Sequence, residues 1–347
     1  MLKKYLNSSM LSLWHQIIDD AQNIILIGHS SPDGDAMGAT LAMFHYLKAL
    51  KKSPVVIMPN TFPDFLWWIP GSQEVLNVQH NYDKAWRIFQ KADAVICLDF
   101  SAYNRIDEMN QWLEESRSPR IIIDHHLNPE LNADLLVSDP QACSTSEIVY
   151  CLLTQLGYDN LMTKECAMCI YCGMMTDTGG FIYNSNRPEI YYIISQLLEK
   201  GIDKDKIYRN VYNNYSVNRM RLMGYILNEK MVYLEEYKTS YFSITRDEML
   251  RFHFKKGDAE GLVNLPLSIK GSILSVSLRE DSEKELIRLS LRSVGEFPCN
   301  KMAAEYFNGG GHLNAAGGTL YCTMEEAIAI VNKAIKDYAP LLKDNKC

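Results

Sequence analysis

The chain has 347 residues, of which 47% are hydrophobic and 22% are charged, which is the composition of a folded globular protein and excludes wholesale disorder. At about 150 residues per domain, this length predicts two domains. The net charge of −7 argues against a protein that tracks long nucleic acid, because such proteins usually carry a basic stripe.

The N-terminal half alternates short β-branched runs with segments of helical periodicity. The runs that we predict as strands are 23–28, 54–58, 93–99 and 120–126. Continuous apolar strands separated by helices predict a parallel sheet that is covered on both faces. Helical patterns follow over 144–176 and 187–200, and Gly201 is placed to end the second helix in a left-handed conformation.

A change of pattern further along predicts a second domain. Residues 202–225 are polar and helical, and we interpret them as a linker. Four segments then alternate or run short as strands do, at 231–237, 240–245, 272–280 and 286–293. A glycine-rich stretch and a helix over 325–338 complete the chain. The predicted fold is a doubly wound, mainly parallel α/β domain over 1–201, followed after the linker by a smaller α+β domain over 226–347.

The sequence also predicts the compartment. No segment approaches the roughly 18–20 uninterrupted apolar residues of a membrane helix. The first segment lacks the apolar core and the cleavage site of a signal peptide. Nine cysteines, an odd number, are too sparse for a disulfide scaffold. We therefore expect a cytoplasmic protein with no membrane contact.

Acidic and histidine side chains follow the apolar runs of the N-terminal half. They are His29, Asp33, Asp35, Asp99, Asp124, His125, His126 and Asp177. Because the carboxyl ends of parallel strands meet at one edge of a sheet, these side chains are expected to share one crevice. Carboxylates and imidazoles suit Mn²⁺ or another borderline-to-hard divalent ion, and so many carboxylates repel one another unless cations neutralise them. Two ions about 3.5–4 Å apart can share one aspartate and clamp a phosphoryl displacement.

Each of these residues alone has a plainer interpretation. An aspartate at the end of a strand often caps the next helix, and Asp35 could cap a helix over 36–50. A histidine pair after a strand can be part of a turn. The joint occurrence at four separate segments favours a functional site.

The same residues resemble the motifs of the DHH phosphoesterases. His29-x-x-x-Asp33-x-Asp35, Asp99, Asp124-His125-His126 and Asp177 stand in the order of that family. The stretches 290–293 (SLRS), 309–312 (GGGH) and 315–318 (AAGG) resemble the DHH-associated C-terminal domain. The resemblance spans nearly the whole chain. It is strongest to the nanoRNases, which degrade very short oligoribonucleotides and also act on 3′-phosphoadenosine 5′-phosphate (pAp).

The resemblance implies a role for each matched residue. One metal ion would be held by His29, Asp33 and Asp99, and a second by Asp35, Asp99, His125 and Asp177, with Asp99 as the bridge. The residues in a catalytic role would be Asp99, Asp124 and His126, of which His126 faces the scissile phosphate and Asp124 orients its neighbours. Substrate would be bound in a cleft between the domains by Arg292, Ser293, Gly309, Gly310, Gly311 and His312. The two ions are expected to be Mn²⁺, with Mg²⁺ and Co²⁺ as alternatives.

Several functions remain open at this point. The leading prediction is hydrolysis of short oligonucleotides to mononucleotides together with dephosphorylation of pAp. The alternatives are a phosphodiesterase for pApA or cyclic di-AMP, a RecJ-type single-strand exonuclease, an exopolyphosphatase or pyrophosphatase, and an inactive nucleotide-binding regulator. The expected partner is a short oligonucleotide or nucleotide without a track for long nucleic acid, and a homodimer is left open.

Cysteines at three-residue spacing allow one more interpretation. Cys166, Cys169 and Cys172 could suggest an iron–sulfur or zinc site. Positions three apart drift around a helix, however, and no fourth ligand has suitable spacing. We therefore interpret the three as small buried residues of a helix packed under the sheet.

Overall fold

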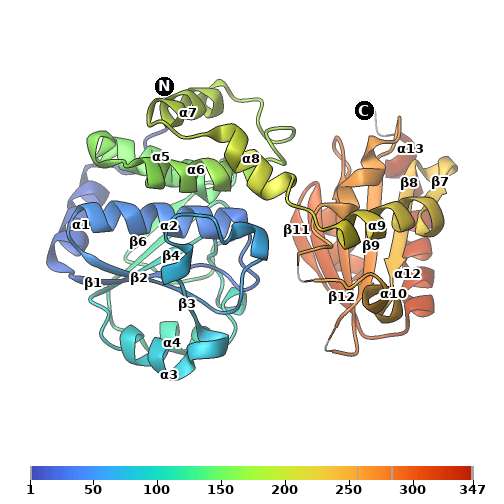
Figure 1. The fold of residues 1–347 in the computed structure, drawn as a ribbon, viewed down its shortest axis with the longest axis horizontal. Coiled ribbons are helices and arrows are strands. Elements are labelled where there is room, and N and C mark those ends of the chain that lie inside the picture. Colours follow the sequence, from blue (N-terminus) through green and yellow to red (C-terminus); the bar gives the residue numbers. More distant parts are fainter. Residues whose placement is uncertain (1, 256, 283, 345–347) are drawn as a thin grey trace. The chain divides into compact units, whose positions relative to one another are not determined.

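The computed structural model describes residues 2–255, 257–282 and 284–344. The chain divides into two compact units, residues 1–214 and 215–347, each with its own hydrophobic core (Figure 1). The division lies within the predicted linker. Helix α8 (Lys204–Tyr212) packs against α6 (Lys164–Asp177) of the first unit, whereas α9 (Val217–Tyr225) contributes to a core of the second. No helix in the described part of the chain is long and apolar enough to cross a membrane.

The N-terminal unit is built on a six-stranded parallel sheet of order β3-β2-β1-β4-β5-β6. Its strands are β1 (Asn23–Ile27), β2 (Ser53–Met58), β3 (Leu76–Asn77), β4 (Ala94–Leu98), β5 (Arg120–Asp124) and β6 (Leu135–Ser138). The four predicted strands are confirmed, and β3 and β6 were not predicted. The strand order reverses between β1 and β4, which makes their carboxyl ends the topological switch point where ligands bind in such sheets.

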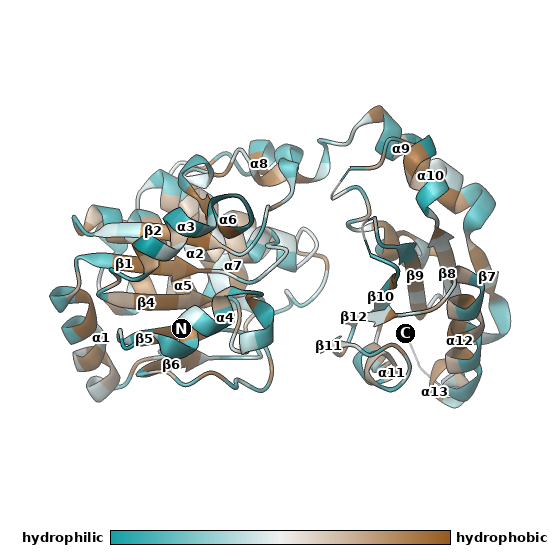
Figure 2. Ribbon diagram, turned by 90° about the horizontal axis from the view of Figure 1, so that it is seen from below, coloured by the Kyte–Doolittle hydropathy of each residue, from teal (hydrophilic) through white to brown (hydrophobic). Residues whose placement is uncertain are grey.

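Helices cover both faces of this sheet, as the doubly wound prediction requires (Figure 1). One face packs on α1 (Ser8–Asp20), α2 (Gly34–Ala49), α5 (Thr145–Gln155) and α6, with α7 (Pro188–Glu199) outside them. The other packs on α3 (Val78–Phe89) and α4 (Met109–Glu115). Alternate residues of β1 enter the two cores, so Ile24 and Ile25 lie in different clusters. The hydrophobic strands lie inside, and hydrophilic residues mark the outer helices (Figure 2).

Helices α2 and α6 approach each other through glycines. A β-carbon added at Gly38 would lie 2.6 Å from the carbonyl oxygen of Cys169 and 2.9 Å from the Cα atom of Gly173. One added at Gly34 would lie 2.3 Å from Oγ1 of Thr176. Because these positions carry no side chain, the two helices pack backbone to backbone. This contact brings the amino end of α2 beside the carboxyl end of α6.

The C-terminal unit contains a mixed six-stranded sheet of order β11-β12-β10-β9-β8-β7, in which only β8 and β9 pair in parallel. Its strands are β7 (Val232–Leu234), β8 (Thr239–Ile244), β9 (Leu274–Glu280), β10 (Ile287–Ser293), β11 (Gly310–His312) and β12 (Ala315–Leu320). The glycine-rich stretch is therefore a hairpin of β11 and β12, which the sequence pattern did not predict.

Helices cover this second sheet unequally. One face is covered by α11 (Cys299–Tyr306) and α12 (Met324–Asp337), which confirms the predicted C-terminal helix. On the other face, α9, α10 (Arg246–Arg251) and the 3-10 helix η7 (Leu262–Ser268) pack with Phe242 and Ile244 of β8. The remaining short elements are η1 (Asp64–Leu66), η2 (Ser72–Glu74), η3 (Tyr103–Arg105), η4 (Asp159–Leu161), the π-helical turn η5 (Ile226–Lys230), η6 (Glu235–Tyr237) and α13 (Ala339–Asp344).

Candidate metal centre

The loop between β1 and α2 carries three of the candidate ligands. His29 lies just beyond β1 and is buried. Asp33 is the N-cap of α2, where its Oδ1 accepts hydrogen bonds from the backbone N–H groups of Asp35 and Ala36, both at 3.0 Å. The cap of this helix is therefore Asp33, and the plainer interpretation of Asp35 as a cap is wrong. Asp35 lies in the first turn with its carboxylate buried.

Asp99 occupies the centre of the cluster. It follows β4 with a φ of +68°, a left-handed conformation that is unfavourable for any residue with a β-carbon and that is typical of functional sites. Its Oδ2 lies 3.4 Å from Nε2 of His29, and its Oδ1 lies 3.5 Å from Nε2 of His125. The carboxylate of Asp99 thus faces histidines from two different loops.

Among the candidate groups of ligand atoms in the described residues, two contain predicted ligands of one ion each, the second without Asp99. His29, Asp33 and Asp99 offer atoms within 4.8 Å of one another, and so do Asp35, His125 and Asp177. Nε2 of His125 lies 3.5 Å from Oδ2 of Asp177 at the end of α6. Two ligands each about 2.1 Å from one ion lie roughly 3–3.4 Å apart, so small movements would convert these groups into coordination shells. The donor set of carboxylates and imidazoles fits a divalent metal ion.

The acids and histidines of the cluster change one another's proton affinity. Burial raises the pKa of Asp35 well above its ordinary value, and the carboxylates of Asp99 and Asp177 raise it further. Burial also raises the pKa of Asp177, to about 7, against the opposing effect of His125. Burial lowers the pKa of His29 and of His125, but the surrounding carboxylates outweigh it and raise these values to about 10 and about 9. The cluster therefore binds protons strongly, and a divalent ion could replace them.

Asp124 holds His126 in place. Its Oδ1 accepts from the backbone N–H of His126 at 3.1 Å and lies 2.7 Å from the ring Nδ1, while its Oδ2 accepts from the Ser101 hydroxyl at 2.5 Å. Burial would raise the pKa of Asp124, but these hydrogen bonds lower it to about 2. A fully buried, ionised carboxylate thus orients the imidazole.

The amino end of α5 contributes residues that the sequence analysis missed. The backbone N–H groups of Thr145 and Ser146 donate to the two carboxylate oxygens of Asp35, at 2.6 and 3.0 Å. The Thr145 hydroxyl donates to Oδ1 of Asp99 at 2.8 Å. Thr145 therefore touches one carboxylate from each predicted ligand group. The capping pattern at 144–147 (STSE) signals a helix start, but no local pattern reveals contacts with acids that precede it by 46 and 110 positions.

The predicted substrate residues of the C-terminal unit do not share one environment. Arg292 on β10 and His312 on β11 both pair with Ala315 of β12, so their side chains lie on the same face of the sheet. Ser293 is 7% exposed, and its hydroxyl donates to the carbonyl of Phe297 at 2.8 Å. We therefore remove Ser293 from the predicted substrate contacts.

The three glycines of the GGGH stretch also differ. A β-carbon on Gly309 would lie 1.9 Å from the carbonyl oxygen of Gly317, and Gly311 has a φ of +141°. A β-carbon on Gly310 would meet no atom within 4 Å. Packing and backbone conformation therefore account for Gly309 and Gly311 but not for Gly310.

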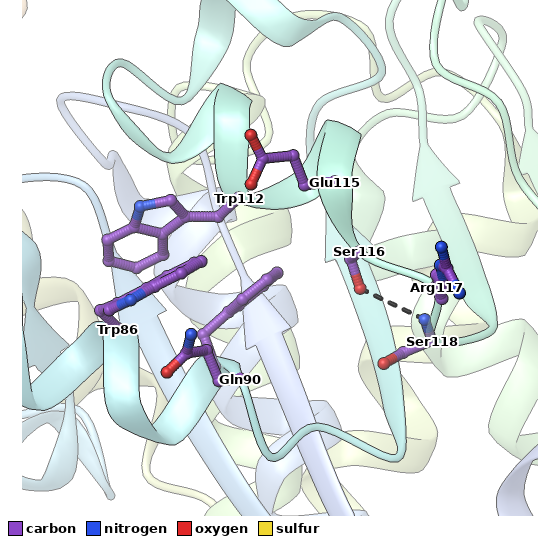
Figure 3. A pocket seen from close by; sticks show the side chains of 8 residues that line it. Trp86, Gln90, Trp112, Glu115, Ser116, Arg117 and Ser118 are labelled. Atoms are coloured by element: carbon purple, nitrogen blue, oxygen red, sulfur yellow. Dashed lines mark hydrogen bonds between the residues drawn. The ribbon is translucent and has the colours of Figure 1, made fainter.

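Two other features do not form part of this centre. Cys166, Cys169 and Cys172 are buried in α6, and burial raises the pKa of each thiol, so thiolate ligands are disfavoured. A pocket of about 500 Å³ is lined by Trp86, Phe89, Gln90, Trp112, Glu115, Ser116, Arg117 and Ser118 (Figure 3). It lies where α3 and α4 end and β5 begins, so it faces the amino edge of the sheet, whereas the acid cluster lies at the carboxyl edge.

Two family models match this chain. The model of the DHH family N-terminal domain matches residues 23–174, and that of the DHHA1 domain matches residues 239–338. The chain therefore belongs to the DHH family, and its relatives among the oligoribonucleases and PAP phosphatases are hydrolases of phosphoester bonds. The two matched regions lie in the two compact units, one in each.

Three relatives represent the similarity. The crystal structure of an exopolyphosphatase-related protein from Bacteroides fragilis is 50% identical, covers 99% of this chain and 100% of its own, and superposes with a TM-score of 0.95. The bifunctional oligoribonuclease and PAP phosphatase NrnA of Thermus thermophilus is 27% identical over 90% of this chain and 89% of its own. The cyclic-di-AMP phosphodiesterase GdpP of Bacillus subtilis is 25% identical over 93% of this chain but only 49% of its own.

Proposed function

We propose that this protein hydrolyses very short oligonucleotides to mononucleotides and removes a phosphate from pAp, with two divalent metal ions. The observation that carries the proposal is the convergence of the acidic and histidine side chains at the switch point of the parallel sheet, where Asp99 faces histidines of two loops. The relative from T. thermophilus, which this chain matches over most of its length, is named for this pair of activities.

The proposed ligands follow the two groups described above. His29, Asp33 and Asp99 would hold one ion, and Asp35, Asp99, His125 and Asp177 the other, with Mn²⁺ as the proposed metal. When bound, such ions neutralise the carboxylates, acidify water and stabilise the charge that develops on a phosphate. The protein supplies the fixed arrangement: α5 holds the carboxylate of Asp35, and Thr145 holds that of Asp99.

His126 is proposed to act on the phosphate itself. Asp124 engages its Nδ1, so a hydrogen bond to a phosphate oxygen, or a proton given to the departing oxygen, would come from Nε2. Because Asp124 is buried and accepts hydrogen bonds on both carboxylate oxygens, it holds the ring in one orientation.

The C-terminal unit is proposed to bind the rest of the substrate. Arg292 is half-buried on β10 and would hold a phosphate in a bidentate fork, and His312 shares its face of the sheet. Gly310 leaves that surface open, so a nucleotide can approach the backbone. A cytoplasmic location is part of this proposal, because the eight cysteines of the described residues form no disulfide and seven of them are buried.

Product analysis with Mn²⁺ tests the proposal. The substrates are pAp, polyphosphate and 5′-phosphorylated oligoadenylates from two to about 24 nucleotides, each at two salt concentrations. We expect kcat/KM to peak at about two to five nucleotides and to depend weakly on salt, because few phosphates are bound. Efficiency that climbs towards the longest chains and collapses with salt would refute the proposal and favour a RecJ-type exonuclease. Phosphate release from polyphosphate alone would favour an exopolyphosphatase.

A second candidate, hydrolysis of pApA or cyclic di-AMP, has support from the similarity to GdpP over 93% of this chain. The same assay separates the two functions when pApA and cyclic di-AMP are added. An efficiency on cyclic di-AMP well above that on pAp and trinucleotides would replace the leading proposal. Arg292→Ala should weaken hydrolysis of either nucleotide far more than that of a generic activated phosphodiester, because only the nucleotides offer a second phosphate.

A further inference from the structure

One face of the C-terminal sheet carries three arginines on two neighbouring strands. Arg279 of β9 and Arg288 of β10 are direct partners in the antiparallel register, and Arg292 lies four positions further along β10. Partners in a sheet share a face, and alternate residues of one strand share a face, so all three side chains lie on the same side. We call this side the arginine face; over β8 it is the side on which α9, α10 and η7 pack. The apolar residues Leu289 and Leu291 of β10 point to the opposite side, into the core under α11 and α12.

The surface between these arginines is made of small residues. In register across four strands lie Ser277, Ser290, Gly317 and Gly310. A β-carbon on Gly310 would meet nothing within 4 Å, and one on Gly317 would meet only the carbonyl oxygen of Leu289, at an ordinary 3.4 Å. Neighbouring atoms therefore do not require glycine at these two positions. Ser277 is buried, whereas Ser290 and Gly310 are exposed, so the arginine face is open over β10, β12 and β11, between Arg292 and Arg288.

Arg279 has no salt-bridge partner among the described residues, and the nearby carboxylate of Asp281 compensates its charge only in part. Arg279 is half-buried and forms no hydrogen bond or ion pair with the described residues, and its guanidinium only lies over the ring of Phe254, 5.3 Å from the centroid. Arg288 lies directly opposite Arg279 on β10 and forms an ion pair with Asp281. Like charges directly opposite in a sheet are destabilising. Burial and then the Arg288 charge lower the pKa of Arg279, and the opposing effect of the Asp281 carboxylate, which is paired with Arg288, does not outweigh them.

We propose that Arg279, with Arg288 opposite it, binds a second phosphate group of the nucleotide chain, separate from the phosphate held at Arg292. This inference rests on the proposed function. Four residues of a strand span about 13 Å, so the two positions are too far apart for the two phosphates of pAp, which share one ribose. A chain of several nucleotides can reach both. The second position thus adds affinity for oligonucleotides and none for pAp.

Arg279→Met tests this proposal, because methionine keeps an apolar side chain over Phe254 and removes the charge. The substrates are 5′-phosphorylated penta-adenylate and pAp. We expect the KM for penta-adenylate to rise about tenfold and the slope of log KM against log salt to fall by about one phosphate contact, with kcat/KM for pAp within about twofold of wild type. Arg279→Lys should restore much of the loss. Arg221→Met, an exposed arginine of α9, is the matched control and should change neither substrate.

Thr319→Glu is a second variant that does not disturb the half-buried arginine. Thr319 pairs with Arg288 in the register of β10 and β12, so a glutamate there would offer the arginines an internal anion. Thr319→Glu should likewise raise the KM for penta-adenylate and leave kcat/KM for pAp unchanged. Equal losses on both substrates, or unchanged KM for penta-adenylate in both variants, would refute the second phosphate position. A wild-type protein that hydrolyses neither substrate would instead refute the proposed function. The second phosphate position would then still be tested by binding, because Arg279→Met should bind labelled penta-adenylate more weakly than wild type if the position exists.

Discussion

Replacing Thr145 by valine removes one hydroxyl group at nearly constant side-chain volume. That hydroxyl donates to Oδ1 of Asp99 at 2.8 Å, and both residues are buried. A hydrogen bond to a charged group contributes about 1.5–3 kcal/mol, which corresponds to a change of roughly one to two powers of ten in an equilibrium constant. Loss of a residue that orients a metal ligand typically lowers metal affinity by about 10- to 100-fold, in agreement with that range. We therefore expect Thr145→Val to bind Mn²⁺ about 10- to 100-fold more weakly than wild type.

Titration calorimetry of chelator-treated protein with Mn²⁺ measures this change without any substrate. Thr145→Ser keeps the hydroxyl and should bind nearly as wild type does. Thr40→Val is the matched control, since the buried Thr40 hydroxyl donates to the carbonyl of Ala36 at 2.7 Å and contacts no acid of the centre. Mn²⁺ affinity of Thr145→Val within about twofold of wild type would show that the hydroxyl does not position Asp99, and so would an equal loss in Thr145→Ser.

Three further predictions concern the same centre. Asp99→Ala should retain the far-ultraviolet circular dichroism of the wild type but lose turnover and both bound ions, because Asp99 faces the ligands of both groups; two retained ions by elemental analysis would contradict its bridging role. Mn²⁺ affinity should rise from about pH 6 to 9, because His29 and His125, with pKa values of about 10 and about 9 in the metal-free protein, must lose protons to become ligands. Calorimetry at pH 7 in two buffers of different ionisation enthalpy should therefore detect proton release, and its absence would remove the histidines from the ligand set. Gly173→Ala should lower both Tm and Mn²⁺ affinity, because the new β-carbon would lie 1.9 Å from Oγ of Ser146 and 2.7 Å from Oδ1 of Asp35; addition of Ser146→Ala should recover part of the loss, and purely additive effects would argue against this clash.

The strands that carry the metal centre could be predicted because each is a short run of β-branched residues followed at once by an acid or a histidine. β6 contains only one β-branched residue in four, and the hairpin of β11 and β12 is rich in glycine and alanine, so neither was found. The contacts of Thr145 could not be predicted, because the helix start it belongs to is recognisable but its distant partners are not.

The position of Ser293, in contrast, could have been predicted from the sequence. Along β10 the residues Ile287, Leu289 and Leu291 are buried, and a period of two places Ser293 on their side of the sheet. The same alternation places Arg288 and Arg292 on the other side. Ser293 was predicted to bind substrate because it adjoins Arg292 in the SLRS motif. That prediction did not take into account that neighbouring residues of a strand face opposite sides of the sheet.

The glycine contact between α2 and α6 also limits how this sequence can change. Gly38 and Gly173 lie where the backbones touch, and the same contact holds Asp35 beside Asp177. A mutation there changes the packing of the two helices and the arrangement of the candidate metal centre together, so a loss in one is not offset by a gain in the other. The outer helix α7, with Tyr191 and Tyr192 about half exposed, has no such coupling. We therefore expect substitutions to accumulate in the outer layer of this unit, while the inner helix pair changes only through compensated double replacements.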